Sequence, residues 1–146
     1  MIQGRKMMKR TDKYPDTSVF HFHNENPKGR ITGDCTFRAI ATATGMCWVD
    51  VVRDMAEMSI KTGYAINDKK GIERYMESIG WIKMPQPRKA DGSKYTGAEF
   101  CKEHQKGRFV CSIGGHHLTC IIDGKLNDIA DCTGKCIGNY WMNGDN

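Results

Sequence analysis

The residues that could do chemistry gather at two places in this chain, a cysteine in its first third and histidines beside aspartates in its last third. Cys35 follows Gly33 and Asp34, a turn residue and a helix-capping residue, and precedes apolar residues at helical spacing. This pattern predicts a helix over residues 35–44 with Cys35 in its first turn. Free backbone N–H groups and the helix dipole favour a thiolate there, and the same N–H groups can stabilise an oxyanion.

The histidines and aspartates lie in a predicted β-hairpin with an Asp-Gly turn at residues 123–124. Asp-Gly between two apolar runs is a strong hairpin signal, because a primed turn needs positive φ at both central positions. The turn sets the register, which puts His116 opposite Asp131 and places His117 diagonally from Asp128 on the other face. Either pair could hold an imidazole beside a carboxylate. For His116 we favour a structural role.

A thiol, an imidazole and a carboxylate are together the parts of an acyl-transfer site. The motifs that carry them are Gly-Asp-Cys-Thr-Phe-Arg-Ala-Ile-Ala at 33–41, Gly-His-His-Leu-Thr-Cys-Ile-Ile-Asp-Gly at 115–124 and Asn-Asp-Ile-Ala-Asp at 127–131. These motifs resemble the papain-like cysteine peptidases. They are most similar to small phage and bacterial proteins of that fold, whose hairpin reads roughly Gly-His-Leu-Thr-Ala-Val-x-Asp-Gly followed by Asp-Thr-Trp-Asp. The resemblance extends from about residue 26 to residue 141.

The resemblance implies a role for each candidate. Cys35 becomes the nucleophile, and His117 becomes the base because it directly precedes the Leu-Thr of the motif. Asp128 matches the first aspartate of the second arm and becomes the residue that orients the imidazole, with Asp131 as the second choice. The implied activity is hydrolysis of a peptide, isopeptide or other amide bond, with a peptide or protein as substrate and no cofactor. For a phage protein, that substrate could be a host protein.

One feature of the family is missing from this chain. Papain-like enzymes usually carry a glutamine shortly before the cysteine, where it completes the oxyanion hole, and no glutamine stands between Gln3 and Gln86. Asn26 or Thr32 could substitute for it, or the backbone N–H of Cys35 could act alone.

Periodicity and turn signals predict an α+β fold, in which helices come first and an antiparallel meander comes last. With the resemblance, this becomes a minimal papain-like fold, in which N-terminal helices pack on a small antiparallel sheet. We expect a flexible arm over residues 1–17 and a single domain over residues 18–146. The expected helices are 35–44, 48–61, 69–78 and about 96–104; the expected strands are 18–23, 81–84, 108–113, the two hairpin arms, and an edge strand or packed tail around 137–141.

Composition narrows the class of protein. No apolar run is long enough to cross a membrane, and the basic N-terminus lacks the apolar stretch of a signal peptide, which favours a cytoplasmic protein. The net charge of +5 is scattered, so we expect no nucleic-acid partner. The seven cysteines are an odd number, and several lie in apolar strands, so we expect reduced thiols rather than a disulfide framework.

Several alternatives stay open. Cys132 with Cys136, and Cys101 with His104, each have the spacing of half a zinc site, although we expect no metal. The fold could also serve a non-catalytic phage or bacterial protein that binds or inhibits a partner. A transferase would use the same thioester with a different acceptor. The oligomeric state stays open, and specificity is expected in the loops 64–70 and 85–94.

Overall fold

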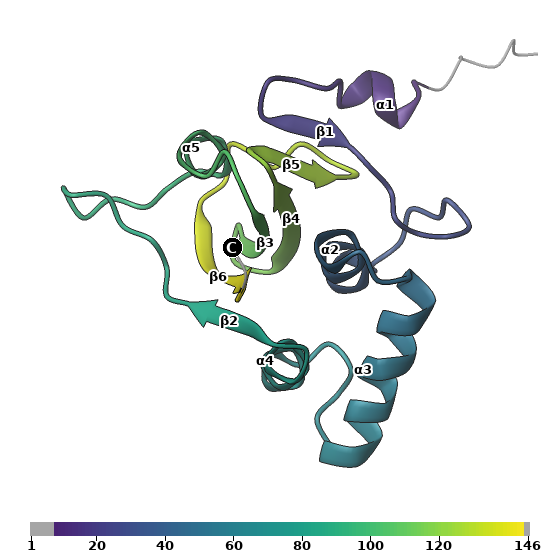
Figure 1. Ribbon diagram of the computed structural model, residues 1–146. Helices are drawn as coiled ribbons and strands as arrows, with labels where there is room; N and C mark the ends of the chain where they lie inside the picture. The colour runs from purple at the N-terminus through teal and green to yellow at the C-terminus, as the bar shows by residue number, and fades with distance from the viewer. Residues whose placement is uncertain (1–7, 145–146) are drawn as a thin grey trace, which may run out of the picture.

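A computed structural model describes residues 8–144 as one six-stranded sheet with helices on both faces (Figure 1). The strand order is β1-β5-β4-β3-β6-β2. The strands are β1 (Phe20–Phe22), β2 (Trp81–Met84), β3 (Arg108–Ile113), β4 (His117–Ile122), β5 (Lys125–Asp128) and β6 (Ile137–Asn143). The helices are α1 (Arg10–Lys13), α2 (Cys35–Thr44), α3 (Trp48–Thr62), α4 (Lys69–Ser78) and α5 (Gly97–Glu103). The predicted α+β class is confirmed.

The predicted hairpin is confirmed in position and register. Asp123 and Gly124 have φ angles of 47° and 78°, as a primed turn requires. Cys120 pairs with Asn127 across β4 and β5. Because the turn is a local feature, its residues fix the pairing without help from the rest of the fold. The hairpin therefore presents Asp128 at the end of β5, beside the first residues of β4.

The sheet differs from the prediction in two respects. It is mixed rather than wholly antiparallel, because β1 runs parallel to β5 and pairs Phe20 with Leu126. In addition, β6 is an interior strand between β3 and β2, so the expectation of a C-terminal edge strand or packed tail was wrong. Both differences come from pairings between segments far apart in the chain, which no local pattern specifies.

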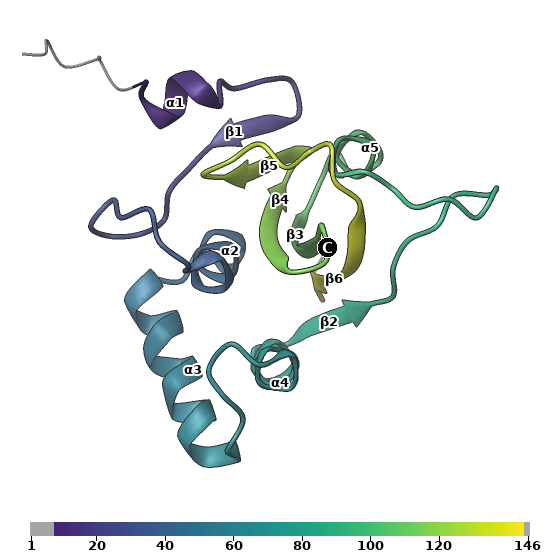
Figure 2. The ribbon, with the colours of Figure 1, turned by 180° about the vertical axis from the view of Figure 1, so that it is seen from behind.

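Each face of the sheet has its own apolar core. On one face, α2, α3 and α4 pack over sheet residues that include Val110, Cys120 and Trp141. On the other face, α5 and β1 contribute to a cluster around Phe109 and Ile121. Figure 2 shows α5 across the sheet from α2. The seven cysteines are not joined by disulfides in the structure.

Part of the segment predicted as a flexible arm, residues 8–17, contacts the rest of the fold. The Arg10 side chain donates to the Ile129 carbonyl, and Tyr14 packs against the second core. The Asp16 carboxylate accepts the backbone N–H of Phe22 at 2.8 Å. These contacts are polar and aromatic rather than periodic, so the hydrophobic pattern did not reveal them. Residues 1–7 lie outside the described residues.

No helix among residues 8–144 is long and apolar enough to cross a membrane.

Candidate active site

Cys35 is the first residue of α2, as predicted, and its thiol is half-buried. Burial acts to raise the pKa of this thiol, but hydrogen bonds with the His117 ring and the Leu118 backbone outweigh burial and lower the pKa from 9.0 to about 7. About half of the thiol is therefore ionised at neutral pH. The predicted position of Cys35 and its neighbours in space thus combine to favour the nucleophilic form.

His117 lies between this thiol and a buried carboxylate. Its Nε2 is 2.6 Å from Oδ2 of Asp128, whose side chain is 2% exposed. The bond to Asp128, followed by contacts with Cys132 and Cys35, raises the pKa of His117 to about 11. Because Nε2 faces Asp128, Nδ1 is the nitrogen left to serve the thiol. Near neutral pH this arrangement favours a thiolate beside an imidazolium.

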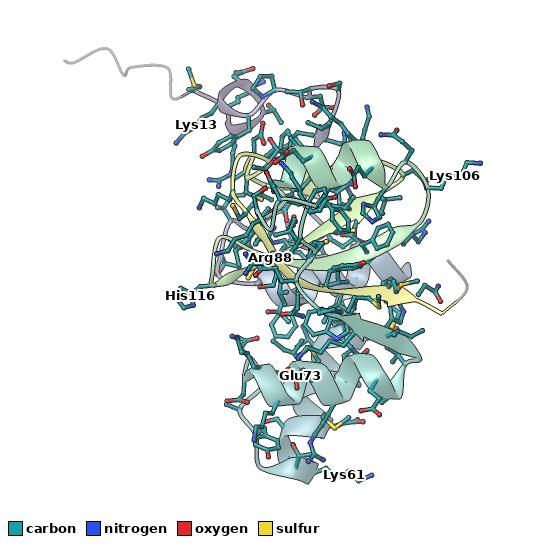
Figure 3. All side chains as sticks on the ribbon, turned by 90° about the vertical axis from the view of Figure 1, so that its left-hand side faces the viewer. Lys13, Lys61, Glu73, Arg88, Lys106 and His116 are labelled. Atoms are coloured by element: carbon teal, nitrogen blue, oxygen red, sulfur yellow. The ribbon has the colours of Figure 1, made fainter. Side chains whose placement is uncertain are left out.

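The structure therefore brings Cys35, His117 and Asp128 together from the start of α2, the start of β4 and the end of β5. Asp131, the second choice for orienting the imidazole, has an exposed side chain that accepts from the backbone N–H and the hydroxyl of Thr133. His116 is exposed in the turn between β3 and β4 (Figure 3), where it lines the cavity that opens beside Cys35. Neither residue takes the place of His117 or Asp128 beside the thiol.

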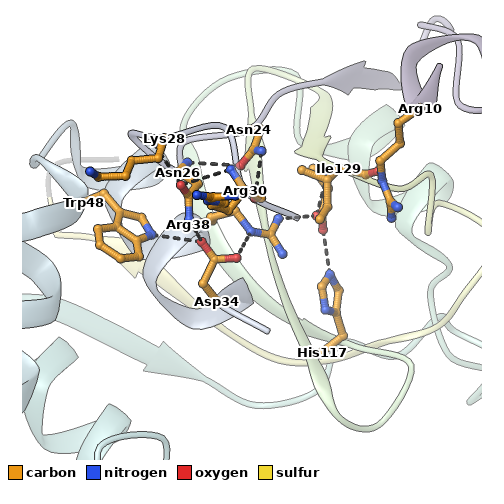
Figure 4. Close-up of polar contacts among 11 residues, drawn as sticks. Arg10, Asn24, Asn26, Lys28, Arg30, Asp34, Arg38, Trp48, His117 and Ile129 are labelled. Atoms are coloured by element: carbon orange, nitrogen blue, oxygen red, sulfur yellow. Dashed lines mark hydrogen bonds and ion pairs between the residues drawn. The ribbon is translucent and has the colours of Figure 1, made fainter. Parts of the chain in front are cut away.

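A buried arginine ties the nucleophile's helix to the carboxylate, and sequence reasoning missed it. Arg38 Nε donates to Asp34 Oδ1 at 2.7 Å, and Arg38 Nη1 donates to Asp128 Oδ1 at 2.8 Å (Figure 4). The Arg38 side chain is 7% exposed. One charged residue within an otherwise apolar helix, four positions after an aspartate, was the available signal. Arg38 fixes Asp128 from the side opposite His117 and leaves Oδ2 free for the imidazole.

Asp34 occupies the N-cap position of α2, but its side chain does not cap the helix. The carboxylate instead accepts from Arg38, from Trp48 Nε1 at 3.0 Å and from Asn26 Nδ2 at 3.0 Å. The prediction of a capping role was thus wrong, because three buried donors compete for the same oxygens. The backbone N–H groups at the start of α2 are left without this cap.

The two side chains predicted as oxyanion-hole candidates, Asn26 and Thr32, do not lie beside the Cys35 thiol. Asn26 is buried, donates to Asp34, and accepts from the backbone N–H groups of Lys28 and Arg30 at 3.0 and 3.2 Å. Its amide therefore holds the turn that precedes α2 rather than facing the thiol. Thr32 is exposed, and neither residue lines the cavity beside Cys35. Neither side chain is therefore placed beside the thiol, and the backbone N–H groups at the start of α2 remain the candidate donors to an oxyanion.

A cavity of about 380 Å³ opens beside the thiol. Cys35 and His117 lie on its wall together with residues from α4, β2, β3 and β6. Of the two loops expected to set specificity, residues 64–70 contribute Asn67 and Lys69, whereas residues 85–94 contribute no residue to the wall. The nucleophile is therefore accessible to a ligand with a sizeable side chain.

The group of side chains best placed to bind a metal ion is not built from the two predicted half-sites. The His104 ring stacks on Phe100, and its Nδ1 contacts the Phe100 carbonyl at 2.9 Å. Within residues 8–144, one group offers three candidate ligand atoms within 4.8 Å of one another, and it comprises His117, Asp128 and Cys132. A thiophilic ion could bind there only by replacing the bond between His117 and Asp128. The same imidazole could not then serve the Cys35 thiol.

Comparison of the chain with protein families, curated proteins and solved structures found no match. The functional argument therefore depends on the site itself.

Proposed function

We propose that the protein is a thiol-dependent amide hydrolase with a minimal papain-like fold, acting on a peptide, isopeptide or related amide. One observation carries the proposal: the Cys35 thiol at the start of α2 contacts the ring of His117, whose Nε2 is 2.6 Å from Asp128 Oδ2. Nucleophile, base and orienting group occur in the relation that covalent acyl transfer requires.

Acylation begins when the Cys35 thiolate attacks the carbonyl carbon of the substrate. The carbonyl π electrons move to oxygen, and the backbone N–H groups at the start of α2 stabilise the resulting oxyanion. As the tetrahedral intermediate collapses, the C–N bond breaks and the His117 imidazolium gives its proton to the leaving amine. The products of this half-reaction are a free amine, a thioester on Cys35 and a neutral imidazole.

In deacylation, water attacks the thioester, so it takes the place that the leaving amine had in acylation. Neutral His117 takes a proton from a water molecule, whose oxygen attacks the thioester carbon. Collapse releases the carboxylic acid, and the thiolate and imidazolium are restored. Asp128 holds the ring through Nε2 in both half-reactions. An amine acceptor in place of water would make the same site a transferase, so the acceptor alone separates the two activities.

No step of this sequence needs a cofactor. It does need a reduced thiol, and the seven free cysteines agree with a reducing compartment such as the cytoplasm.

Covalent trapping tests the proposal. A peptidyl acyloxymethyl ketone, which alkylates an active-site thiolate, is expected to add once to the wild-type protein, at Cys35. Cys47 and Cys136, which are exposed, are the matched controls within the same molecule. Because Cys35 contacts an imidazole that lowers the pKa of its thiol, it is expected to react at least about tenfold faster than either. Peptide mass spectrometry locates the adduct, and Cys35→Ala is expected to abolish it. Adducts confined to Cys47 and Cys136 would favour a non-catalytic binding protein.

A further inference from the structure

Strand β6 contains an irregularity directly beside the proposed site. Its pairing with β3 shifts between Cys111↔Tyr140 and Ile113↔Ile137, so Gly138 and Asn139 together oppose Ser112 alone. This two-against-one arrangement is a β-bulge, a feature that often re-aims a side chain next to an active site.

The bulge has a visible effect on the two faces of β6. Ile137 and Tyr140 both pack in the second core although they are three residues apart, which a regular strand would not allow. Asn139 and Trp141 are two residues apart and share the other face, where both line the cavity beside Cys35. The bulge moves Ile137 off that face into the second core, so Asn139 is the last residue of β6 on the cavity side before the irregularity.

The Asn139 amide is poorly satisfied where it lies. Its Nδ2 is buried and has no hydrogen-bond partner among the residues that the structure describes. A buried donor without an acceptor is destabilising, because it has lost its water and gained no partner. A ligand that brings an oxygen to this position would supply the missing acceptor.

The remaining wall combines apolar and cationic groups. Trp141, Ile72 and Leu118 are nearly buried and offer apolar surface. Glu73 contacts Lys83 at 2.6 Å, so these two charges offset each other. Lys69 also lies on the wall, and no carboxylate pairs with it in the described part of the chain. The wall residues from α4, β2 and β6 therefore carry one excess positive charge.

Resting on the proposed thiol chemistry, we propose that this cavity selects a glutamate side chain next to the scissile bond. The methylene groups pack against Trp141, one carboxylate oxygen accepts from Asn139 Nδ2, and Lys69 provides charge complementarity. Glutamine offers the oxygen without the charge and is expected to rank second. Leucine fits the apolar wall but leaves Asn139 unpaired, and lysine adds repulsion from Lys69.

A set of probes tests this order. Dipeptidyl acyloxymethyl ketones that carry Glu, Gln, Leu or Lys at either position are compared by their second-order rate of addition to Cys35, measured by intact mass. At the position that enters the cavity, Glu is expected to react at least about tenfold faster than Leu and faster still than Lys. Asn139→Leu, which removes the donor at similar volume, is expected to reduce the Glu preference over Leu roughly tenfold. Asn139→Asp is expected to move the preference from Glu toward Lys.

Asn143→Leu, on the same strand but outside the cavity wall, is the matched control and should keep the wild-type order.

Two further measurements separate this inference from the proposed function. Iodoacetamide should alkylate Cys35 at the same rate in the wild type and in Asn139→Leu, because the thiol and its imidazole are unchanged. In Cys35→Ala, acetyl-glutamate amide should shift the Asn139 side-chain NMR resonances, and acetyl-lysine amide should not. A reactive Cys35 with no preference for Glu at either position would overturn the glutamate inference alone. An inert Cys35 would remove the proposed function, and the NMR titration would still decide the cavity.

Discussion

Replacing Asp128 with alanine is expected to slow hydrolysis of the acyl-Cys35 intermediate by at least about 100-fold. The imidazole of His117 loses the 2.6 Å bond that orients it, and with it the main cause of its raised pKa. The acyl-enzyme can be formed with p-nitrophenyl acetate, and loss of the acetyl group can be followed by intact mass. This readout needs no knowledge of the natural substrate.

Two further variants test whether Asp128, rather than Asp131, is the residue that orients His117. Asp128→Asn should recover most of the rate, because its carbonyl oxygen can still accept the Nε2–H of His117. Asp131→Ala removes a nearby carboxylate that accepts hydrogen bonds from Thr133, and we expect less than about a twofold change. Wild-type deacylation in folded Asp128→Ala, or a large loss in Asp131→Ala, would show that the orienting residue is wrongly assigned.

Replacing Arg38 with leucine is expected to lower the free energy of unfolding by about 3–5 kcal/mol at pH 7, measured by urea denaturation. The side chains of Asp34 and Asp128 are 5% and 2% exposed, and Arg38 is the cation that both of them contact. The variant leaves these two carboxylates buried without it. Arg53→Leu breaks an exposed ion pair with Asp50 and should cost no more than about 1 kcal/mol.

The pH dependence of the stability lost in Arg38→Leu shows whether the loss comes from the missing charge or from the missing packing of the side chain. Burial acts to raise the pKa of Asp34 and of Asp128. Hydrogen bonds, including those from Arg38, outweigh burial, so both pKa values lie below 3.8. In the wild type, their contribution is present above pH 3.8 and is lost as the pH falls through the lowered values. In Arg38→Leu, Asp128 keeps its bond with His117 and Asp34 keeps its donors Asn26 and Trp48, but both lose the guanidinium and can protonate in the folded state at a higher pH than in the wild type. The difference in stability should therefore shrink between pH 7 and pH 3, whereas a constant difference would indicate lost packing alone.

Local chemistry explains what the sequence predicted well. The Asp-Gly turn determined the register of β4 and β5, and the capping box at Thr96 and Glu99 determined the start of α5. Helical spacing after Asp34 placed Cys35 at the start of α2. Each signal involves residues a few positions apart, so the surrounding fold had little opportunity to override it.

Long-range contacts explain what the sequence did not predict. The bond from Arg38 to Asp128 spans 90 positions. Asp34 lost its expected capping role because its carboxylate accepts from Arg38, Trp48 and Asn26 instead. The bulge that separates the face of Asn139 from that of Ile137 depends on pairing with β3, a strand more than twenty residues earlier in the chain. Asn26 was expected near the oxyanion, but its amide is used to hold the turn before α2.

The central claim is that His117 holds Cys35 as a thiolate at neutral pH. The most direct test is the pH dependence of iodoacetamide alkylation at each cysteine, measured by peptide mass spectrometry in the wild type and in His117→Ala. Since the pKa of the Cys35 thiol is lowered to about 7, its rate should rise with pH and level off above that value. Without the imidazole, burial is left to act, and the rise should move to about pH 9 or higher. Cys47 and Cys136, both exposed, should behave alike in the two proteins. A rise of Cys35 alkylation at the same pH with and without His117 would contradict the thiolate–imidazolium pair and the hydrolase proposed from it.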